Sequence, residues 1–86
     1  MAKYSVQIKK SAQKEIRELP KPMIKRVLTK IYALADDPRP SGSRKLIGYE
    51  NYWRIRVGNY RVIYTIDDGV LLVEVIAVRH RKDAYQ

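Results

Sequence analysis

The sequence of 86 residues has no cysteine and a single histidine. Without cysteine it cannot have a disulfide framework, a thiolate zinc site or a cysteine nucleophile. One histidine leaves only scattered carboxylates as metal ligands, and the pairs Asp36-Asp37 and Asp67-Asp68 fit helix-end and turn positions more simply. We therefore expect neither a metal nor another cofactor, and a metal-dependent nuclease is disfavoured.

Long apolar runs are missing as well. Residues 1–9 contain no continuous apolar stretch, and no run approaches the roughly 18 residues that a membrane span needs. We therefore expect a cytoplasmic protein without a membrane partner. Residues 1–86 are short enough to form one domain, which has little room for a deep cavity, so an active site should be an open surface groove.

Acidic residues are few. The sequence has nine Asp and Glu against 18 Lys and Arg, which leaves a net charge of +9. Such a charge attracts polyanions, which implies a nucleic acid or an acidic protein partner. The lysines of the N-terminal half are spread over predicted helices and are typical of solvated helix faces. Arginine dominates the second half, and its planar fork suits phosphate.

Hydrophobic periodicity divides the first half into a strand and two helices. Residues 4–8 alternate apolar and polar side chains, which predicts a half-buried strand. Ser11 is expected to cap a short helix that Pro20 ends, and Pro22 suits the first turn of a second helix with an apolar stripe. Residues 36–43 are rich in turn formers and should form an exposed, flexible loop.

From Tyr52 onward the pattern predicts three strands joined by two tight turns. Gly58-Asn59 suits a type II′ turn and Asp68-Gly69 a type I′ turn. Two-residue turns would place Val57 opposite Tyr60 and Arg56 opposite Arg61. The predicted fold class is therefore α+β, namely a strand, two helices and a three-strand antiparallel meander with the helices packed on one face of the sheet.

The two faces of this meander differ in chemistry. The apolar face, which should pack under the helices, holds Trp53, Ile55, Val57, Tyr60, Val62, Tyr64, Ile66, Leu71, Val73, Val75 and Ala77. The other face holds Tyr52, Arg54, Arg56, Arg61, Ile63, Thr65, Leu72, Glu74, Ile76 and Val78. Like charges placed opposite each other cost stability, so the arginines indicate an anion site for phosphate. A face neutralised by Glu74 and Glu50 is the alternative.

Strict alternation makes two further predictions near the C-terminus. His80 extends the arginine face, where it is either incidental or a proton-transfer group. Arg81 falls on the core side, and because a buried unpaired arginine is costly, we expect the strand to end near Val78 and the chain to turn. Tyr52 and Tyr85 can stack on a base, whereas Tyr60 and Tyr64 are expected to be packing residues.

RNA can be cleaved without a metal when the neighbouring 2′-hydroxyl attacks the scissile phosphate. A protein contributes by holding the atoms in line and by stabilising charge on the phosphorane. Arginines can do both, but a guanidinium cannot accept a proton.

The element order and three segments resemble the RelE/ParE toxin superfamily over nearly the whole chain. The segments are Tyr-Trp-Arg-Ile-Arg-Val-Gly-Asn-Tyr-Arg-Val-Ile-Tyr at 52–64, Arg-Lys-Leu-Ile-Gly at 44–48 and Val-Arg-His-Arg-Lys-Asp-Ala-Tyr at 78–85. The resemblance implies a RelE-like fold and a toxin of a type II toxin-antitoxin system, with a RelB-like antitoxin as partner. The RelE branch implies cleavage of mRNA on the ribosome, whereas the ParE branch implies a non-enzymatic inhibitor of DNA gyrase.

Residue roles also follow from the resemblance. Arg61 would contact the scissile phosphate, Arg81 would stabilise the transition state or assist the leaving group, and Tyr85 would stack on or orient the substrate. Arg54 and Arg56 stand where RelE toxins have Lys-x-Lys, so either His80 or a hydroxide-like path would replace the lysine that acts as general base. Expected substrate-binding residues are Tyr52, Arg44, Lys45 and Arg79. An inert basic RNA-binding domain is the remaining alternative.

Overall fold

The computed structural model describes residues 3–48 and 50–82. Its elements, in chain order, are β1 (Ser5–Ile8), α1 (Lys10–Arg17), α2 (Lys21–Ala33), β2 (Arg44–Lys45), β3 (Tyr52–Val57), β4 (Tyr60–Asp67) and β5 (Leu72–His80). Among the described residues, no helix is long and apolar enough to cross a membrane.

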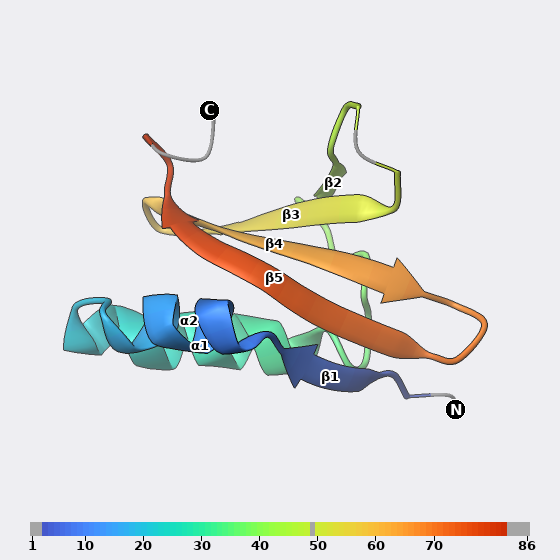
Figure 1. Cartoon of the computed structure of the whole chain (residues 1–86), viewed down its shortest axis with the longest axis horizontal. Helices are drawn as coiled ribbons and strands as arrows, with labels where there is room; N and C mark the ends of the chain where they lie inside the picture. Colours follow the sequence, from blue (N-terminus) through green and yellow to red (C-terminus); the bar gives the residue numbers. More distant parts are fainter. Residues whose placement is uncertain (1–2, 49, 83–86) are drawn as a thin grey trace.

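The strands form one mixed sheet in the order β1-β5-β4-β3-β2. β1 runs parallel to β5, and the other neighbours are antiparallel. Figure 1 shows α1 and α2 on the same side of this sheet. The predicted α+β class, with its antiparallel meander and helices on one face, is confirmed. The short edge strand β2 was not predicted, since two residues leave no periodic signal.

Both helices follow the predicted pattern, except that the first helix starts earlier than predicted. α1 buries Ala12 and Ile16, but its N-cap is Lys9 and no side chain caps it, so the expectation for Ser11 is wrong. The helix starts early because β1 leads directly into it, and Gln13 Nε2 donates a hydrogen bond to the Ile8 carbonyl at 2.8 Å. α2 begins after Pro20 with Pro22 in its first turn, as predicted.

The β3–β4 hairpin has the predicted register. Val57 lies opposite Tyr60 and Arg56 opposite Arg61. Gly58 has φ 60°, the left-handed value that the first central position of a type II′ turn requires and that glycine adopts without a Cβ clash. On its outer edge, β3 pairs with β2 at Trp53 and Arg54, and the Tyr52 carbonyl accepts a hydrogen bond from the Leu46 N–H at 2.8 Å.

The β4–β5 turn is longer than predicted. Asp67 pairs with Leu72, so the connection has four residues, 68–71, and the predicted two-residue type I′ turn is wrong. The Asp67 carboxylate accepts hydrogen bonds from the backbone N–H of Gly69 at 2.9 Å and of Val70 at 3.2 Å. These bonds stabilise the wider turn, and Leu71 completes it with φ 54°.

A β-bulge in β5 changes the face assignment of the C-terminal strand. Tyr64 pairs with Val75 and Ile63 with Ala77, so Ile76 is an extra residue. Before the bulge the predicted faces hold. Beyond it they are exchanged, so that Val78 lies with Val62 over the core and Ala77 lies opposite Ile63. The predicted faces of Ala77, Val78 and His80 are therefore wrong.

The core lies between this sheet face and the helices. Fully buried side chains from both layers meet there, among them Val27, Ile31, Val62, Tyr64, Val73 and Val75. The Tyr64 hydroxyl donates a hydrogen bond to the Pro38 carbonyl at 2.8 Å, and burial raises the pKa of Tyr64 to about 12. Pro38 is itself buried, so the loop at 36–43 is exposed only in part.

A polar cluster fastens the same loop to the far end of the sheet. Arg39 donates to both carboxylate oxygens of Asp68, at 3.3 and 2.9 Å, and the Tyr4 hydroxyl donates to Asp68 at 2.6 Å. The Arg39 guanidinium also lies 5.2 Å from the centre of the Trp53 ring. Three parts of the chain that are distant in sequence are thus tied together, which fixes the position of the loop.

This cluster gives stability a pH dependence. Hydrogen bonds from Arg39 and then from Tyr4 lower the pKa of Asp68 in the folded state. A carboxyl group with a lowered folded pKa stabilises the fold above its unfolded pKa, near 4, and loses that contribution as the pH falls through the folded value. We expect Asp68→Asn to have a lower Tm than the wild type at pH 7, and the gap to close below about pH 4. Thermal unfolding from pH 7 to pH 2 measures this. Glu18→Gln, an exposed change, is the control, and a gap that is constant over this range contradicts the assignment.

Candidate functional site

Three arginines lie side by side across the central strands. Arg56 of β3 is directly opposite Arg61 of β4, and Arg61 is directly opposite Arg79 of β5. Arg61 is only 7% exposed, whereas Arg56 and Arg79 are exposed. Like charges in this arrangement repel each other, so the row is favourable for binding an anion.

A cavity of about 270 Å³ lies at the hairpin end of this row. It is lined by Arg56, Gly58, Tyr60, Arg61 and Arg81. The backbone N–H of Arg81 donates to the Asn59 carbonyl at 2.7 Å, which holds the residue after β5 against the hairpin turn. Three of the predicted site residues therefore meet around one small cavity, which we call the arginine cavity.

The bulge at Ile76, and not a turn after Val78, brings Arg81 to this place. β5 continues to His80, so the expected early end of the strand is wrong. The extra residue moves Arg79 to the position opposite Arg61, and Arg81 follows two residues later on the same side.

The same exchange turns His80 away from Arg61. His80 lies opposite Tyr60, and their rings meet edge to face with centroids 5.3 Å apart. Its Nδ1 accepts a hydrogen bond from the Lys82 N–H at 3.2 Å. His80 does not line the arginine cavity, and its predicted place on the arginine face is wrong.

Tyr60 is a cavity residue that sequence reasoning assigned to packing. It is half-buried and lines the arginine cavity together with Arg61. Alternation alone puts it on the apolar face. Its position next to the hairpin turn, at the end of the β3–β4 pair, is the signal that could have found it.

Glu15 of α1 holds the end of β5 from the opposite edge. β1 pairs with β5 only as far as Val75, so β5 has an open edge beyond it. There the Glu15 carboxylate accepts a hydrogen bond from the Val78 N–H at 2.9 Å and forms an ion pair with Arg79 Nε at 3.4 Å. The Nε side of the Arg79 guanidinium is thus paired with Glu15.

Arg44 and Arg54 belong to a second, larger cavity of about 650 Å³. Arg54 is 8% exposed and its Nη1 donates to the Gly42 carbonyl at 3.4 Å. Arg44 lies opposite it on β2. The lining combines α2, the loop before β2 and the edge of β3, and it comprises Lys30, Ala33, Asp37, Pro40, Ser41, Gly42, Arg44, Arg54, Ile55 and Arg56. Arg56 lines both cavities.

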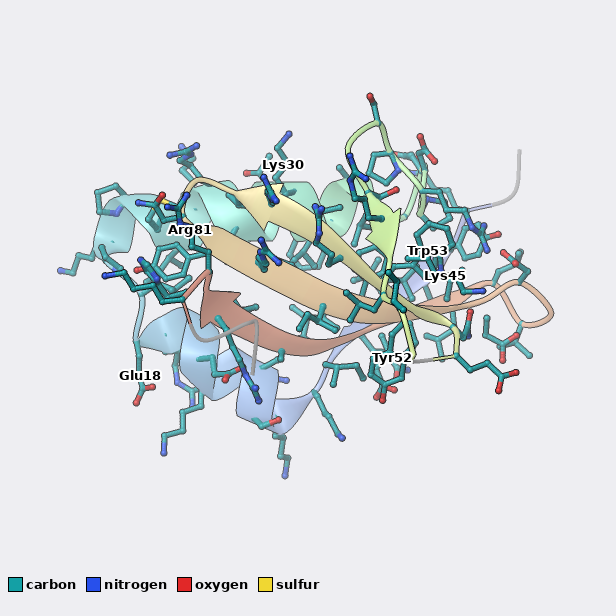
Figure 2. All side chains as sticks on the ribbon, turned by 90° about the horizontal axis from the view of Figure 1, so that it is seen from above. Glu18, Lys30, Lys45, Tyr52, Trp53 and Arg81 are labelled. Atoms are coloured by element: carbon teal, nitrogen blue, oxygen red, sulfur yellow. The ribbon has the colours of Figure 1, made fainter. Side chains whose placement is uncertain are left out.

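Two of the other predicted site residues lie far from Arg81. Tyr52 begins β3 and pairs with Thr65, five residues before the hairpin turn, and Lys45 pairs with Trp53. Figure 2 shows Tyr52, Trp53 and Lys45 together at the end of the sheet opposite to Arg81. Tyr85 lies outside the described residues. Within 3–48 and 50–82, no three His, Asp or Glu side chains gather where they could hold a metal ion.

Residues 6–85 match the model of the family described as "ParE toxin of type II toxin-antitoxin system, parDE". The chain belongs to this toxin family. RelE of Mycobacterium tuberculosis is 30% identical over 84 residues, which are 96% of this chain and 87% of that protein. The predicted membership in the RelE/ParE superfamily is confirmed, and the protein is a toxin of a type II toxin-antitoxin system.

Solved structures agree with this assignment. The toxin is similar to a chain of the archaeal RelE-RelB complex from Pyrococcus horikoshii, with TM-score 0.83, 29% identity and coverage of 94% of this chain and 98% of that chain. It is also similar to a chain of the RelBE2 toxin-antitoxin complex from Mycobacterium tuberculosis, with TM-score 0.81, 28% identity and coverage of 96% and 97%.

The contacts of Glu15 predict its contribution to stability. Glu15→Ala leaves the buried Val78 N–H without its acceptor, so we expect a loss of about 1–3 kcal/mol in the free energy of unfolding. Glu15→Gln keeps an acceptor oxygen and loses only a partly exposed ion pair, worth about 0–1 kcal/mol. Urea unfolding measures both. Glu18→Ala, on the exposed side of the chain after α1 (Figure 2), is the control, and equal stability of Glu15→Ala and Glu18→Ala would refute the role.

Proposed function

We propose that the toxin is a ribosome-dependent endoribonuclease that cleaves mRNA without a metal ion. The observation that carries the proposal is the convergence of Arg56, Arg61 and Arg81 on one cavity. A compact group of guanidinium ions is suited to the charge that develops on a phosphate under attack. The net charge of +9 adds a field that draws RNA to the surface.

The proposed reaction is an internal transesterification. The 2′-oxygen forms a bond to the adjacent phosphorus while the bond from phosphorus to the 5′-oxygen of the next nucleotide breaks. The products are a 2′,3′-cyclic phosphate and a 5′-hydroxyl end, and the proton lost by the 2′-hydroxyl balances the one gained by the leaving oxygen. The protein's contribution is alignment and stabilisation of the phosphorane.

Each cavity residue has a distinct proposed part. Arg61, nearly buried and therefore well fixed, holds the scissile phosphate. Arg81, whose backbone is bonded to Asn59, stabilises the charge on the leaving oxygen. Arg56 neutralises the remaining phosphate oxygen, and the Tyr60 hydroxyl is the neutral group of the cavity that can exchange hydrogen bonds with the substrate. Tyr85 retains its proposed role of orienting the substrate.

A ribosome requirement is consistent with the small size of this site. A cavity of about 270 Å³ is too small to enclose an extended RNA segment, so a second surface must hold the strand in line for attack. We propose that the ribosome supplies that surface and presents a codon of the mRNA.

We propose a RelB-like antitoxin as the partner that silences the toxin. The two solved relatives described above are complexes of RelE with RelB. An acidic or amphipathic helical segment that covers the basic surface would suit the charge of this chain. Such a complex should weaken as salt is added, because screening reduces the attraction between exposed charges.

Inhibition of DNA gyrase is the second candidate. The description of the matched family names ParE, and the resemblance to the ParE branch implies a non-enzymatic inhibitor of gyrase. The curated relative and the solved structures named above are instead RelE proteins. The arginine cavity favours chemistry on RNA over a protein contact.

The test compares mRNA cleavage on programmed ribosomes for the wild type and for single variants. We expect Arg61→Ala and Arg81→Ala each to lower the cleavage rate by about 10²–10³, the usual effect of removing one donor that stabilises the transition state. Mapping of mRNA 5′ ends gives the rate and the cut positions. Lys25→Ala, an exposed change on α2 that does not line the cavity, is the matched control and should cleave like the wild type.

Two results would defeat the proposal. The first is a folded Arg61→Ala variant that cleaves at the wild-type rate. The second is a wild type that leaves mRNA intact and translation unaffected while it inhibits supercoiling by purified gyrase, which would establish the second candidate instead.

A further inference from the structure

We propose that His80 is a positioning residue, whose ring holds the Tyr60 side chain in place at the wall of the arginine cavity. This role rests on the proposed function and deepens it, because Tyr60 is the neutral cavity residue assigned to hydrogen bonding with the substrate. His80 thus acts on the reaction through Tyr60 and not by accepting a proton.

The two rings form a cross-strand pair at the end of the sheet next to the hairpin turn. Tyr60 is the first residue of β4 and lies directly opposite His80, the last residue of β5. The ring planes are 82° apart and the centroids are 5.3 Å apart, which is the edge-to-face arrangement that aromatic pairs prefer. The next pair along the same strands is Arg61 with Arg79, so the ring contact lies beside the row of arginines.

His80 is itself fixed by the backbone that follows it. Its Nδ1 accepts a hydrogen bond from the Lys82 N–H at 3.2 Å, and the Arg81 N–H donates to the Asn59 carbonyl at 2.7 Å. Rotation of the imidazole ring would break the first bond, and movement of the strand end would break the second. The His80 ring is therefore a fixed support against which the Tyr60 ring can rest.

Tyr60 needs such a support because of its place at the cavity wall. The side chain is half-buried and lines the cavity with Arg56, Arg61 and Arg81. Its hydroxyl is at the far end of the ring, so a small rotation about the Cα–Cβ bond moves the oxygen a long way. A misplacement of about 1 Å in an active site can lower the rate about 10²-fold. A contact that selects one orientation of the ring therefore affects the reaction from outside the cavity.

The location of His80 argues against proton transfer. A general base must come within about 2.6–3.2 Å of the atom that gives up its proton. Among the described residues, His80 is not part of the lining of the cavity in which the phosphate would lie. The contact with Tyr60 is the route that the structure offers from His80 to the substrate.

Two substitutions at residue 80 separate the ring from its nitrogen. His80→Phe keeps an aromatic ring and has no atom that can accept a proton, whereas His80→Asn keeps a polar acceptor for the Lys82 N–H and has no ring. On programmed ribosomes we expect His80→Asn to lower kcat about 2–10-fold, the effect of losing one edge-to-face contact, with KM unchanged. His80→Phe should restore most of the wild-type kcat.

A double variant shows whether the loss acts through Tyr60. Tyr60→Phe keeps the ring contact and removes the hydroxyl, so it should lower kcat by itself. Once the hydroxyl is absent, its orientation no longer matters, and adding His80→Asn should cause no further loss. Urea unfolding checks that each variant is folded under the assay conditions. A loss caused by instability alone would be the same with and without the hydroxyl.

The orientation of the Tyr60 ring can be measured without any cleavage. Three-bond NMR couplings between Hα and the two Hβ atoms report whether the χ1 angle has one staggered value or is averaged. We expect the couplings of a single rotamer in the wild type and in His80→Phe, and averaged couplings in His80→Asn. Tyr64, which is fully buried and donates to the Pro38 carbonyl, is the internal control and should give the same couplings in all three proteins.

Three kinetic results would overturn the positioning role. The first is a His80→Phe variant that cleaves as slowly as His80→Asn, because the nitrogen would then be required. The second is a His80→Asn variant with the wild-type kcat, and the third is an additive loss when His80→Asn is combined with Tyr60→Phe. A wild type that cleaves no mRNA defeats the proposed function instead. The couplings of Tyr60 then still decide, since equal couplings in the wild type and in His80→Asn would mean that His80 does not orient the ring.

Discussion

The register between β4 and β5 is the constraint on which the site depends. One extra residue, Ile76, shifts everything after it by one position, so that Val78 packs over the core and Arg79 and Arg81 come to the side of Arg61. Without the bulge, Arg81 would point toward the helices and its guanidinium would need a buried partner. The same shift therefore completes both the core and the arginine cavity.

The arginines repel one another, and the surrounding structure keeps them in place. Glu15 binds the Val78 N–H and Arg79 at one edge, the Asn59 carbonyl holds Arg81 at the hairpin, and the Gly42 carbonyl accepts from Arg54 at the other edge. These contacts hold the arginines in place through backbone carbonyls and one helix carboxylate. The net charge of +9 adds a positive field, which is a property that a phosphate site requires.

Much of the fold could be predicted from the sequence, because it depends on local periodicity. The strand at 4–8, the helix that starts near Pro22 and the hairpin at Gly58 all have short-range signals, and the facing pair Arg56 and Arg61 follows from the hairpin turn. The family resemblance, based on the element order and on residues 44–48, 52–64 and 78–85 together, pointed to the toxin superfamily to which the chain belongs.

The features that sequence reasoning missed depend on contacts between distant segments. Ile76 continues an apolar run, so nothing in the sequence separates a bulge from regular alternation. The four-residue turn depends on how the Asp67 side chain bonds to Gly69 and Val70, and not on the Asp-Gly pair itself. The larger cavity joins α2, the loop before β2 and the edge of β3, and no sequence motif spans these three segments.

The short pairing between β2 and β3 has a consequence for solubility. In the described part of the chain, β2 and the Leu46 N–H cover the outer edge of β3 from Tyr52 to Arg54, so the edge at residues 55–57 has no neighbouring strand and offers backbone groups to any strand that approaches. Open edges of this kind promote self-association unless charge guards them, and the exposed Arg56 stands on this edge. The positive charge of Arg56, which is proposed to bind substrate, thus also opposes self-association of the toxin. Replacing Arg56 by a neutral residue would therefore lower activity and also promote aggregation.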